Sequence, residues 1–429
     1  MTFSLPASAR SKVFKRHLAD YDDELRLANK HVDCEAMVKR LQDLGVTSYY
    51  WLIWHEKTDW DDLKIFLPQA ARARISVYVY LVPPTEGHSS GYPSSEPFGE
   101  DYPKWAEEIA RLSRQYPNLR GWIIDDFYAN HRLFTPEYVR QTRRRARKIN
   151  PDLVFLPLMY FPEITSQFAE AYHDVIDGCV IAYPPDRNAI RNARAVLDGK
   201  LTMVPGQFGC PWQTPTAAGD FASASTVCRA RGGQSPRVTF KEEDDFTGPT
   251  AGYHYKQLLV DDEVVWEQDV AGGEKAWKEE HIDLAPWVTG KPGFRLTFRL
   301  YDRKGVGNFG IHWRVKDLRA EGFKLSASLQ SPWKWQVASK GPIETGFGKR
   351  LIPPPQKIHI PFVVMTAAQP QEFRLRHGDP ATPQRMGEWL QMCLKSWRAG
   401  ECDGVATYVL DKRPESKFYP VAKELFRKY

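Results

Sequence analysis

The feature that most constrains this chain is a unit that recurs between about residues 30 and 200. Each unit consists of a short run rich in β-branched and aromatic residues, a polar loop and an amphipathic helical segment. Such alternation is typical of parallel strands that are joined by crossover helices. The apolar runs predict strands at 47–54, 75–82, 120–127, 153–161 and 178–183.

A weaker apolar run near 11–17 predicts one further strand before these five. Between the strands, apolar residues recur at helical spacing, for example Met37, Leu41 and Leu44. Because this spacing places them on one face of a helix, we expect each helix to pack against a sheet.

The pattern changes between about residues 205 and 352, where helical spacing almost disappears. Short alternating strands separated by turn residues replace it, and Asp261-Asp262 predicts the turn of a hairpin. A run of such strands is typical of an antiparallel β-sandwich or jelly roll. The predicted strands are 237–242, 256–270 (containing the hairpin), 294–303 and 308–322.

The α/β pattern resumes after 352–356, a Pro-rich segment that predicts a stiff linker. Two more strands are expected, at 358–365 and 403–409. Six strands before the sandwich and two after it make eight, the number that closes a (β/α)₈ barrel.

The sequence therefore predicts an α/β fold, a TIM-type barrel with an all-β, jelly-roll-like sandwich inserted between strands 6 and 7. The alternative is an open doubly wound sheet. It is disfavoured because no strand is followed by a Gly-rich phosphate-binding loop. The expected segments are 1–204 for strands 1–6, 205–352 for the sandwich and 353–429 for strands 7–8.

Composition and targeting signals indicate a soluble globular protein. Hydrophobic residues make up 42% and charged residues 26% of the 429 residues. The first residues lack the apolar core of a signal peptide, and no run approaches the roughly 20 apolar residues of a membrane span. We expect no membrane partner, and either a cytoplasmic location or an export signal that has been removed.

The six cysteines have no metal-like spacing, so most are expected to be buried thiols. Cys210 and Cys228 are candidates for a disulfide in an exported protein. No His, Cys or carboxylate cluster has metal-ligand spacing either. We therefore expect neither a metal nor another cofactor.

The net charge of the chain is +6, and its basic residues are most concentrated in 140–148, on an expected helix. Val139, Thr142 and Ala146 mark its apolar face, which predicts that the arginines face solvent. A nucleic-acid patch is the alternative, but no stacking module accompanies it, so no nucleic-acid partner is expected.

In a (β/α)₈ barrel the active site lies at the C-terminal ends of the strands. Carboxylates, aromatic residues and histidines gather at the predicted strand ends. These residues are Trp54, His55, Glu56, Glu86, Asp125, Asp126, Tyr128, His131, Tyr160, Tyr183, Gln369 and Asp411.

Asp125 and Asp126 stand side by side at the end of an apolar run. Because adjacent strand residues point to opposite faces, at most one is expected to face the barrel axis. Different surroundings would give the two carboxyls different pKa values, as acid/base chemistry requires. The structural alternative is that one of them caps a helix or anchors a loop.

Other residues at the strand ends have weaker functional assignments. Glu56 is a candidate partner carboxylate, although 56–62 also resembles a helix start with Thr58 as cap. His55 and His131 are candidates for binding a polar ligand, although a single histidine is often structural. Glu86 and Asp411 are further substrate-binding candidates. The sequence contains no G-x-S-x-G motif, so it does not indicate a serine hydrolase.

In outline, the chain resembles (β/α)₈-barrel glycoside hydrolases. The resemblance rests on the run from Trp122 to Phe127 that contains both aspartates, on the aromatic strand ends and on the sandwich. Chitinase-type barrels carry a D-x-x-D-x-D-x-E pattern at this strand, whereas Tyr128 stands here where a Glu would be expected. The resemblance therefore does not transfer the chitinase mechanism. The inserted segment is similar to carbohydrate-binding jelly rolls, which also serve as spacers.

The resemblance implies a glycosidase that cleaves a poly- or oligosaccharide with two carboxylates. A separation of about 5 Å between them predicts retention and one of roughly 6.5–9.5 Å inversion. One of the two aspartates, with Glu56 or another acid, would form the pair. The residues expected to stack on sugar rings are Trp54, Tyr128, Tyr160 and Tyr183, and those expected to bind hydroxyls are His55, His131 and Gln369.

Barrel packing is the alternative role of these aromatic residues. The alternative functions are a non-catalytic carbohydrate-binding protein and a barrel enzyme of another class, such as a polysaccharide lyase or a deacetylase.

Overall fold

The computed structural model describes residue 14 and residues 16–199, 206–231, 234–246, 248, 250–272, 276–307, 309–348 and 358–429. The chain divides into two compact units, of which the first comprises Met1–Gly199 with Gln356–Tyr429 and the second Lys200–Pro355. The junctions expected near residues 204 and 352, and the linker 352–356, lie outside the described residues.

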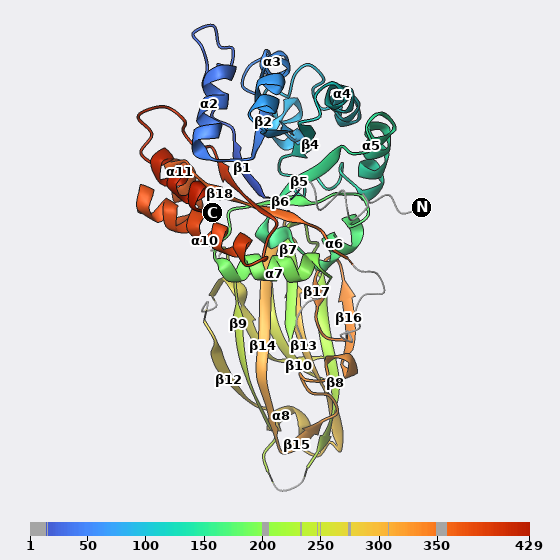
Figure 1. Cartoon of the computed structure of the whole chain (residues 1–429). Helices are drawn as coiled ribbons and strands as arrows, with labels where there is room; N and C mark the ends of the chain where they lie inside the picture. The colour runs from blue at the N-terminus through green and yellow to red at the C-terminus, as the bar shows by residue number, and fades with distance from the viewer. Residues whose placement is uncertain are drawn as a thin grey trace. The chain divides into compact units, whose positions relative to one another are not determined.

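The first unit is a closed barrel of parallel strands with helices around it, which confirms the predicted fold class (Figure 1). The strand order is β1-β19-β18-β6-β5-β4-β3-β2, so the two strands that follow the insertion close the barrel between β6 and β1. The strands are β1 His17–Tyr21, β2 Ser48–Ile53, β3 Ser76–Leu81, β4 Leu119–Ile124, β5 Val154–Tyr160, β6 Cys179–Ala182, β18 Phe362–Ala367 and β19 Gly404–Tyr408.

Polar residues define where the barrel helices begin. Asp33, Asp101, Thr135, Asp186 and Thr382 each accept a backbone N–H of the first helical turn. A cap of this kind stabilises a helix by about 1 kcal/mol. The helices are α2 Cys34–Leu44, α3 Asp59–Arg72, α4 Tyr102–Gln115, α5 Pro136–Ile149, α6 Ser166–Tyr172, α7 Arg187–Leu197, α9 Pro370–His377, α10 Pro383–Arg398 and α11 Tyr419–Lys428.

The barrel strands are buried on both faces. On β4, Ile123 belongs to the cluster that fills the barrel interior, whereas Trp122 and Ile124 pack into the cluster that the helices cover. The two-residue period of a strand produces this division. Among the described helices, none combines the length and apolar character needed to cross a membrane.

The first barrel strand is β1, whereas the expected range 11–17 lies largely outside the described residues. Two polar residues weaken the apolar signal of β1. His17 Nε2 lies 2.8 Å from the Tyr50 hydroxyl, and Asp20 Oδ1 accepts from the Thr407 hydroxyl at 2.6 Å. Both side chains are buried, and the buried Lys412 Nζ also lies 2.7 Å from Asp20 Oδ2, which balances the Asp20 charge.

The basic run is only partly solvent-facing, which corrects the sequence prediction. Arg143 on α5 is buried, with 4% of its side chain exposed, and pairs with Asp177. Arg147 pairs with the other oxygen of the same carboxylate at 2.9 Å. The helical pattern predicted that Arg143 faces solvent. It is buried instead, because the buried Asp177 carboxylate, which lies outside this helix, balances the charge of Arg143.

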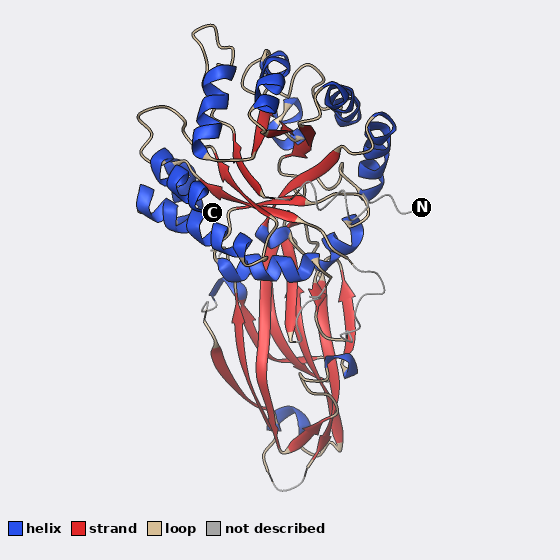
Figure 2. Ribbon diagram, viewed as in Figure 1, coloured by secondary structure: helices blue, strands red, loops and turns tan. Residues whose placement is uncertain are grey.

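The second unit is a β-sandwich of two antiparallel sheets, drawn as strands in Figure 2. One has the order β11-β10-β13-β8-β15, with β16 also paired to β8, and the other has the order β12-β9-β14-β7-β17. Phe240 and Phe298, from opposite sheets, pack edge to face at 5.1 Å in the shared core. The strands are β7 Gln207–Thr214, β8 Phe221–Ala230, β9 Arg237–Asp244, β10 His254–Val260, β11 Glu263–Asp269, β12 Lys278–Asp283, β13 Gly293–Asp302, β14 Phe309–Glu321, β15 Phe323–Leu325, β16 Gln336–Lys340 and β17 Glu344–Thr345.

The expected hairpin joins β10 to β11 through Asp261 and Asp262, and both residues have positive φ. This conformation suits a tight two-residue hairpin turn. Cys210 and Cys228 do not form the disulfide that an exported protein would permit, because all six cysteines are buried free thiols.

Candidate active site

Asp125 follows β4 directly and is largely buried, with 9% of its surface exposed. Its N–H donates to the Leu81 carbonyl at 3.0 Å, which continues the β4–β3 ladder by one residue. Burial, and then the charges of Asp126 and Glu86, raise the pKa of Asp125 well above its usual value. This shift favours the neutral form of Asp125.

Asp126 has φ +40°, so strand alternation stops here. β4 ends at Ile124, whereas the sequence predicted a strand through Phe127. The Asp126 carboxylate accepts the Tyr160 hydroxyl at 2.5 Å. Burial raises the pKa of Asp126, while the Tyr160 hydrogen bond and the Arg376 charge act against this rise and favour the ionised form.

The backbone at Asp126 is fixed by a short network. The Asp126 N–H donates to Asp125 Oδ1 at 2.8 Å. The Asn130 side-chain amide donates to the Asp126 carbonyl and to the Thr85 hydroxyl, both at 2.9 Å. These bonds tie the loop after β4 to the loop after β3, so they stabilise the unusual φ angle.

Glu86 ends η1 (Pro84–Glu86), the short 3₁₀ turn after β3. Burial, and then the charge of Asp126, raise the pKa of Glu86 to about 7. The charge of Asp126 thus favours the protonated form of Glu86, while Tyr160 and Arg376 oppose the rise that burial causes in the pKa of Asp126.

Glu163 is a further acid in this group that the sequence assigned no role. It ends η3 (Phe161–Glu163) after β5, is fully buried and accepts the Tyr160 N–H at 2.8 Å. Burial raises the pKa of Glu163 to about 8, and Asp126 contributes to the rise. A signal was present, because a Glu three residues after the strand end is typical of a capping box.

Tyrosines from five strand ends pack beside these acids. Tyr21 lies 4.2 Å from Tyr80 and stacks on Tyr408 at 5.0 Å between ring centres. Tyr183 stacks on Tyr160 at 5.9 Å and meets Tyr408 edge-on at 5.4 Å.

Of these tyrosines, the sequence nominated Tyr160 and Tyr183 as ligand-stacking residues. Arg376 lies over the Tyr183 ring at 4.5 Å, so this ring already has a cation against one face. The sequence did not nominate Arg376 because α9, its helix, gives no clear amphipathic signal.

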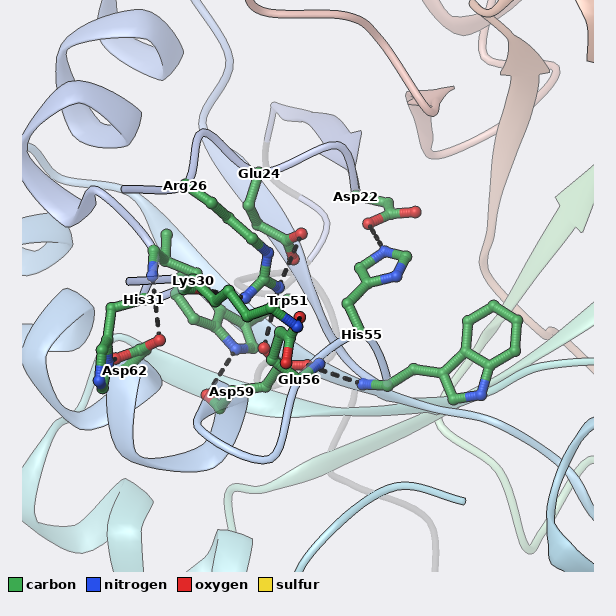
Figure 3. Close-up of polar contacts among 12 residues, drawn as sticks. Asp22, Glu24, Arg26, Lys30, His31, Trp51, His55, Glu56, Asp59 and Asp62 are labelled. Carbon is green, nitrogen blue, oxygen red and sulfur yellow. Dashed lines mark hydrogen bonds and ion pairs between the residues drawn. The ribbon is translucent and has the colours of Figure 1, made fainter. Parts of the chain in front are cut away.

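A second group lies after β1 and β2 and contains three of the predicted residues (Figure 3). His55 Nε2 lies 2.8 Å from Asp22 Oδ1, and this contact, stronger than the opposing effect of burial, raises the pKa of His55 to about 9. Glu56 forms an ion pair with Lys30 at 2.9 Å. Trp54 donates its indole N–H to the Pro93 carbonyl at 2.8 Å.

Glu56 is therefore engaged by Lys30. Lys30 first, and then Arg26 and His55, lower the pKa of Glu56. The predicted pairing of Glu56 with Asp125 or Asp126 has no support in these contacts.

The remaining predicted residues have local structural contacts. His131 Nδ1 lies 2.8 Å from the Tyr128 carbonyl, and the two rings stack at 5.1 Å. The Gln369 side chain accepts the Glu372 N–H as the N-cap of α9. Asp411 accepts from Arg413 Nε at 2.8 Å.

Asp22, Glu24 and His55 also form a cluster with metal-ligand composition, one donor atom of each lying within 4.8 Å of the others. The sequence did not predict this cluster. The sequence predicted the first strand at 11–17, so Asp22 and Glu24 were not recognised as residues that follow a strand end. His55 comes from a separate strand end.

No family model and no curated protein matches the sequence. Solved structures are similar at low identity. A family 39 glycoside hydrolase from Bacteroides cellulosilyticus is 12% identical over 43% of this chain and 46% of its own length, with a TM-score of 0.32. The endoglucanase Cel5A of Pseudomonas stutzeri is 15% identical over 43% of this chain and 83% of its own, with a TM-score of 0.27.

An HpcH/HpaI aldolase from Desulfitobacterium hafniense is also similar. It is 11% identical over 45% of this chain and 70% of its own, with a TM-score of 0.26. The chain thus spans less than half of the family 39 enzyme.

Proposed function

We propose that the protein is a glycoside hydrolase that acts on a poly- or oligosaccharide, with Glu86 and Asp126 as its two working carboxylates. The observation that carries this proposal is the half-buried position of Glu86 near Asp126 at neighbouring strand ends, where burial, and then the charge of Asp126, raise the pKa of Glu86 to about 7. Glycosidic cleavage needs one protonated and one ionised carboxyl group, and in this proposal Glu86 is the protonated member and Asp126 the ionised one.

Glu86 acts as the general acid and donates its proton to the oxygen of the leaving sugar. Asp126 is the ionised partner, which either attacks the anomeric carbon or removes a proton from an attacking water. The Tyr160 hydroxyl and Arg376 support this role because both favour the charged form of Asp126.

Asp125 is a positioning residue in this scheme. Its raised pKa favours the neutral form, which would add no second negative charge beside Asp126. Its Oδ1 accepts the Asp126 N–H and so helps to hold the backbone of the ionised residue.

The test is hydrolysis of a glycan panel, with products identified by NMR. We expect Glu86→Gln and Asp126→Asn each to lower kcat by about 10²-fold or more, the lower end of the contribution of a general acid. Asp61→Asn, which changes an exposed acid paired with Lys64 on α3, is the matched control and should retain full activity.

Full activity in both carboxylate variants would overturn the proposal. Binding of a glycan without any product, at equal affinity in wild type and Glu86→Gln, would indicate a carbohydrate-binding protein instead. An unsaturated sugar among the products would indicate a lyase.

A further inference from the structure

We infer that Asp22, Glu24 and His55 form a binding site for a divalent transition-metal ion such as Zn²⁺. One donor atom of each residue lies within 4.8 Å of the others, and Figure 3 shows the three side chains turned toward one another. Donors around Zn²⁺ lie about 2.0–2.2 Å from the ion. Binding of the ion would draw the three donor atoms closer together than they now lie.

Glu24 supplies an independent indication of a ligand. Its side chain is 1% exposed, and one carboxylate oxygen, Oε1, is buried with no hydrogen-bond partner among the residues that the structure describes. The other oxygen, Oε2, lies 3.4 Å from Arg26. Buried polar atoms are almost always satisfied, and a metal ion in the cluster would satisfy this one.

The donor set selects the class of ion. One imidazole nitrogen and two carboxylates suit Zn²⁺ or Mn²⁺, whereas Ca²⁺ and Mg²⁺ prefer oxygen ligands alone. His55 Nε2 and Asp22 Oδ1 now share a proton across 2.8 Å. The ion takes the place of this proton, which passes to solvent when the metal binds.

The surrounding residues hold the donors in place. Arg26 donates to Asp59 Oδ1 at 2.8 Å as well as contacting Glu24. The second oxygen of Asp59 accepts the backbone N–H groups of Trp54 and Glu56, both at 3.0 Å, on either side of His55. Partners of this kind orient the ligands of a metal site.

The metal site can be tested separately from hydrolysis, because none of its three ligands acts as acid or nucleophile in the proposed reaction. Asp22 follows Tyr21, whose ring stacks on Tyr408. Water or a sugar hydroxyl would complete the coordination of the ion.

The experiment uses the full chain, freed of metal with EDTA and dialysed, and titrated calorimetrically with ZnCl₂. We expect one Zn²⁺ per chain, with much weaker binding of Ca²⁺ and Mg²⁺, and a rise in unfolding temperature with Zn²⁺. Asp22→Asn, Glu24→Gln and His55→Ala should each weaken Zn²⁺ binding by at least about 10- to 100-fold, the loss caused by removing even an indirect partner.

His31→Ala is the matched control, because His31 pairs with Asp62 at 2.6 Å in the same region but outside the three-residue cluster. Its Zn²⁺ affinity should equal that of the wild type. Circular dichroism identifies any variant that fails to fold, and the near-isosteric Asp22→Asn and Glu24→Gln provide two independent tests. Absence of stoichiometric Zn²⁺ binding in the wild type, or unchanged affinity in the folded ligand variants, would overturn the inference.

Discussion

At the scale of single residues, the adjacent aspartates coexist because their surroundings differ. Asp125 continues the β4 ladder into a buried position, which raises its pKa and favours the neutral form. Asp126 has a left-handed backbone conformation that ends the strand, and its carboxylate accepts a hydrogen bond from the Tyr160 hydroxyl. The sequence predicted two environments, but strand alternation alone did not reveal the left-handed turn.

Removal of the Tyr160 hydroxyl tests how Asp126 is kept ionised. Tyr160→Phe takes away a hydrogen bond to the charged form, so we expect the pKa of Asp126 to rise. The acidic limb of the kcat profile should then move to higher pH, and kcat near pH 6 should fall by about 10-fold or more, because such a bond contributes ~1.5–3 kcal/mol. Tyr92→Phe, at an exposed tyrosine, is the control. An unmoved acidic limb would show that Tyr160 does not stabilise the anion.

Glu86 sets the expected behaviour at high pH. Its pKa of about 7 means that the acid form is lost as the pH rises through this value. Activity should therefore decline above about pH 7 in the wild type. The residual activity of Glu86→Gln should not show this decline, as measured by kcat/KM between pH 5 and 9 in buffers of constant ionic strength. A decline that persists unchanged in the variant would assign this limb to another group.

The sequence nominated Asp125, Asp126 and Glu86 as candidates because parallel strands bring their C-terminal ends together. It did not nominate Glu163, Arg376 or Asp22. Their contacts depend on which distant side chains lie beside them, such as His55 for Asp22. Local patterns carry no information about these neighbours.

At the scale of elements, strand and helix periodicity predicted most of the barrel. The prediction was least accurate where burial depends on a polar partner. β1 carries buried His17 and Asp20, and β8 is rich in small Ala and Ser residues, so neither has a strong β signal. Arg143 on α5 is a similar case in a helix: its burial, which the helical pattern did not predict, depends on Asp177.

The link between α5 and Asp177 gives a stability prediction. Asp177→Asn leaves the buried Arg143 without a counter-charge and should lower the free energy of unfolding by about 3–5 kcal/mol. Urea unfolding followed by circular dichroism measures the change. Arg145→Ala, at a position 60% exposed and 3.8 Å from Glu107, should cost less than about 1 kcal/mol. Equal stability of Asp177→Asn and wild type would show that the pair contributes nothing net.

At the scale of the whole molecule, the barrel residues that precede and follow the inserted sandwich contact each other. The Ile360 N–H donates to the Leu197 carbonyl at 2.9 Å, and Arg194 Nη2 donates to the Ile360 carbonyl at 2.7 Å. The barrel and the sandwich have separate hydrophobic clusters. Each unit therefore has the core that an independently folding domain needs.

Excision of the sandwich tests this independence. A chain in which a short Gly/Ser linker replaces 200–356 should keep a folded barrel, because Leu197 and Ile360 are already adjacent. We expect near-native activity on short oligosaccharides and weaker binding of polymers, measured by calorimetry and by pull-down on insoluble glycans. The isolated sandwich should retain the polymer affinity that the barrel loses. Unfolding of the excised barrel would show that the sandwich has a structural role.

The adjacency of Leu197 and Ile360 also bears on the order of folding. Pairing of β6 with β18 requires the chain to close across the whole insertion, and the entropy lost in such a closure grows with the logarithm of loop length. A sandwich that has already folded shortens this closure, because pairing of Thr345 with Phe208 holds its first and last strands together. The last quarter of the barrel should therefore assemble faster after the sandwich than before it, and a mutation that slows sandwich folding should delay barrel closure without weakening the finished barrel.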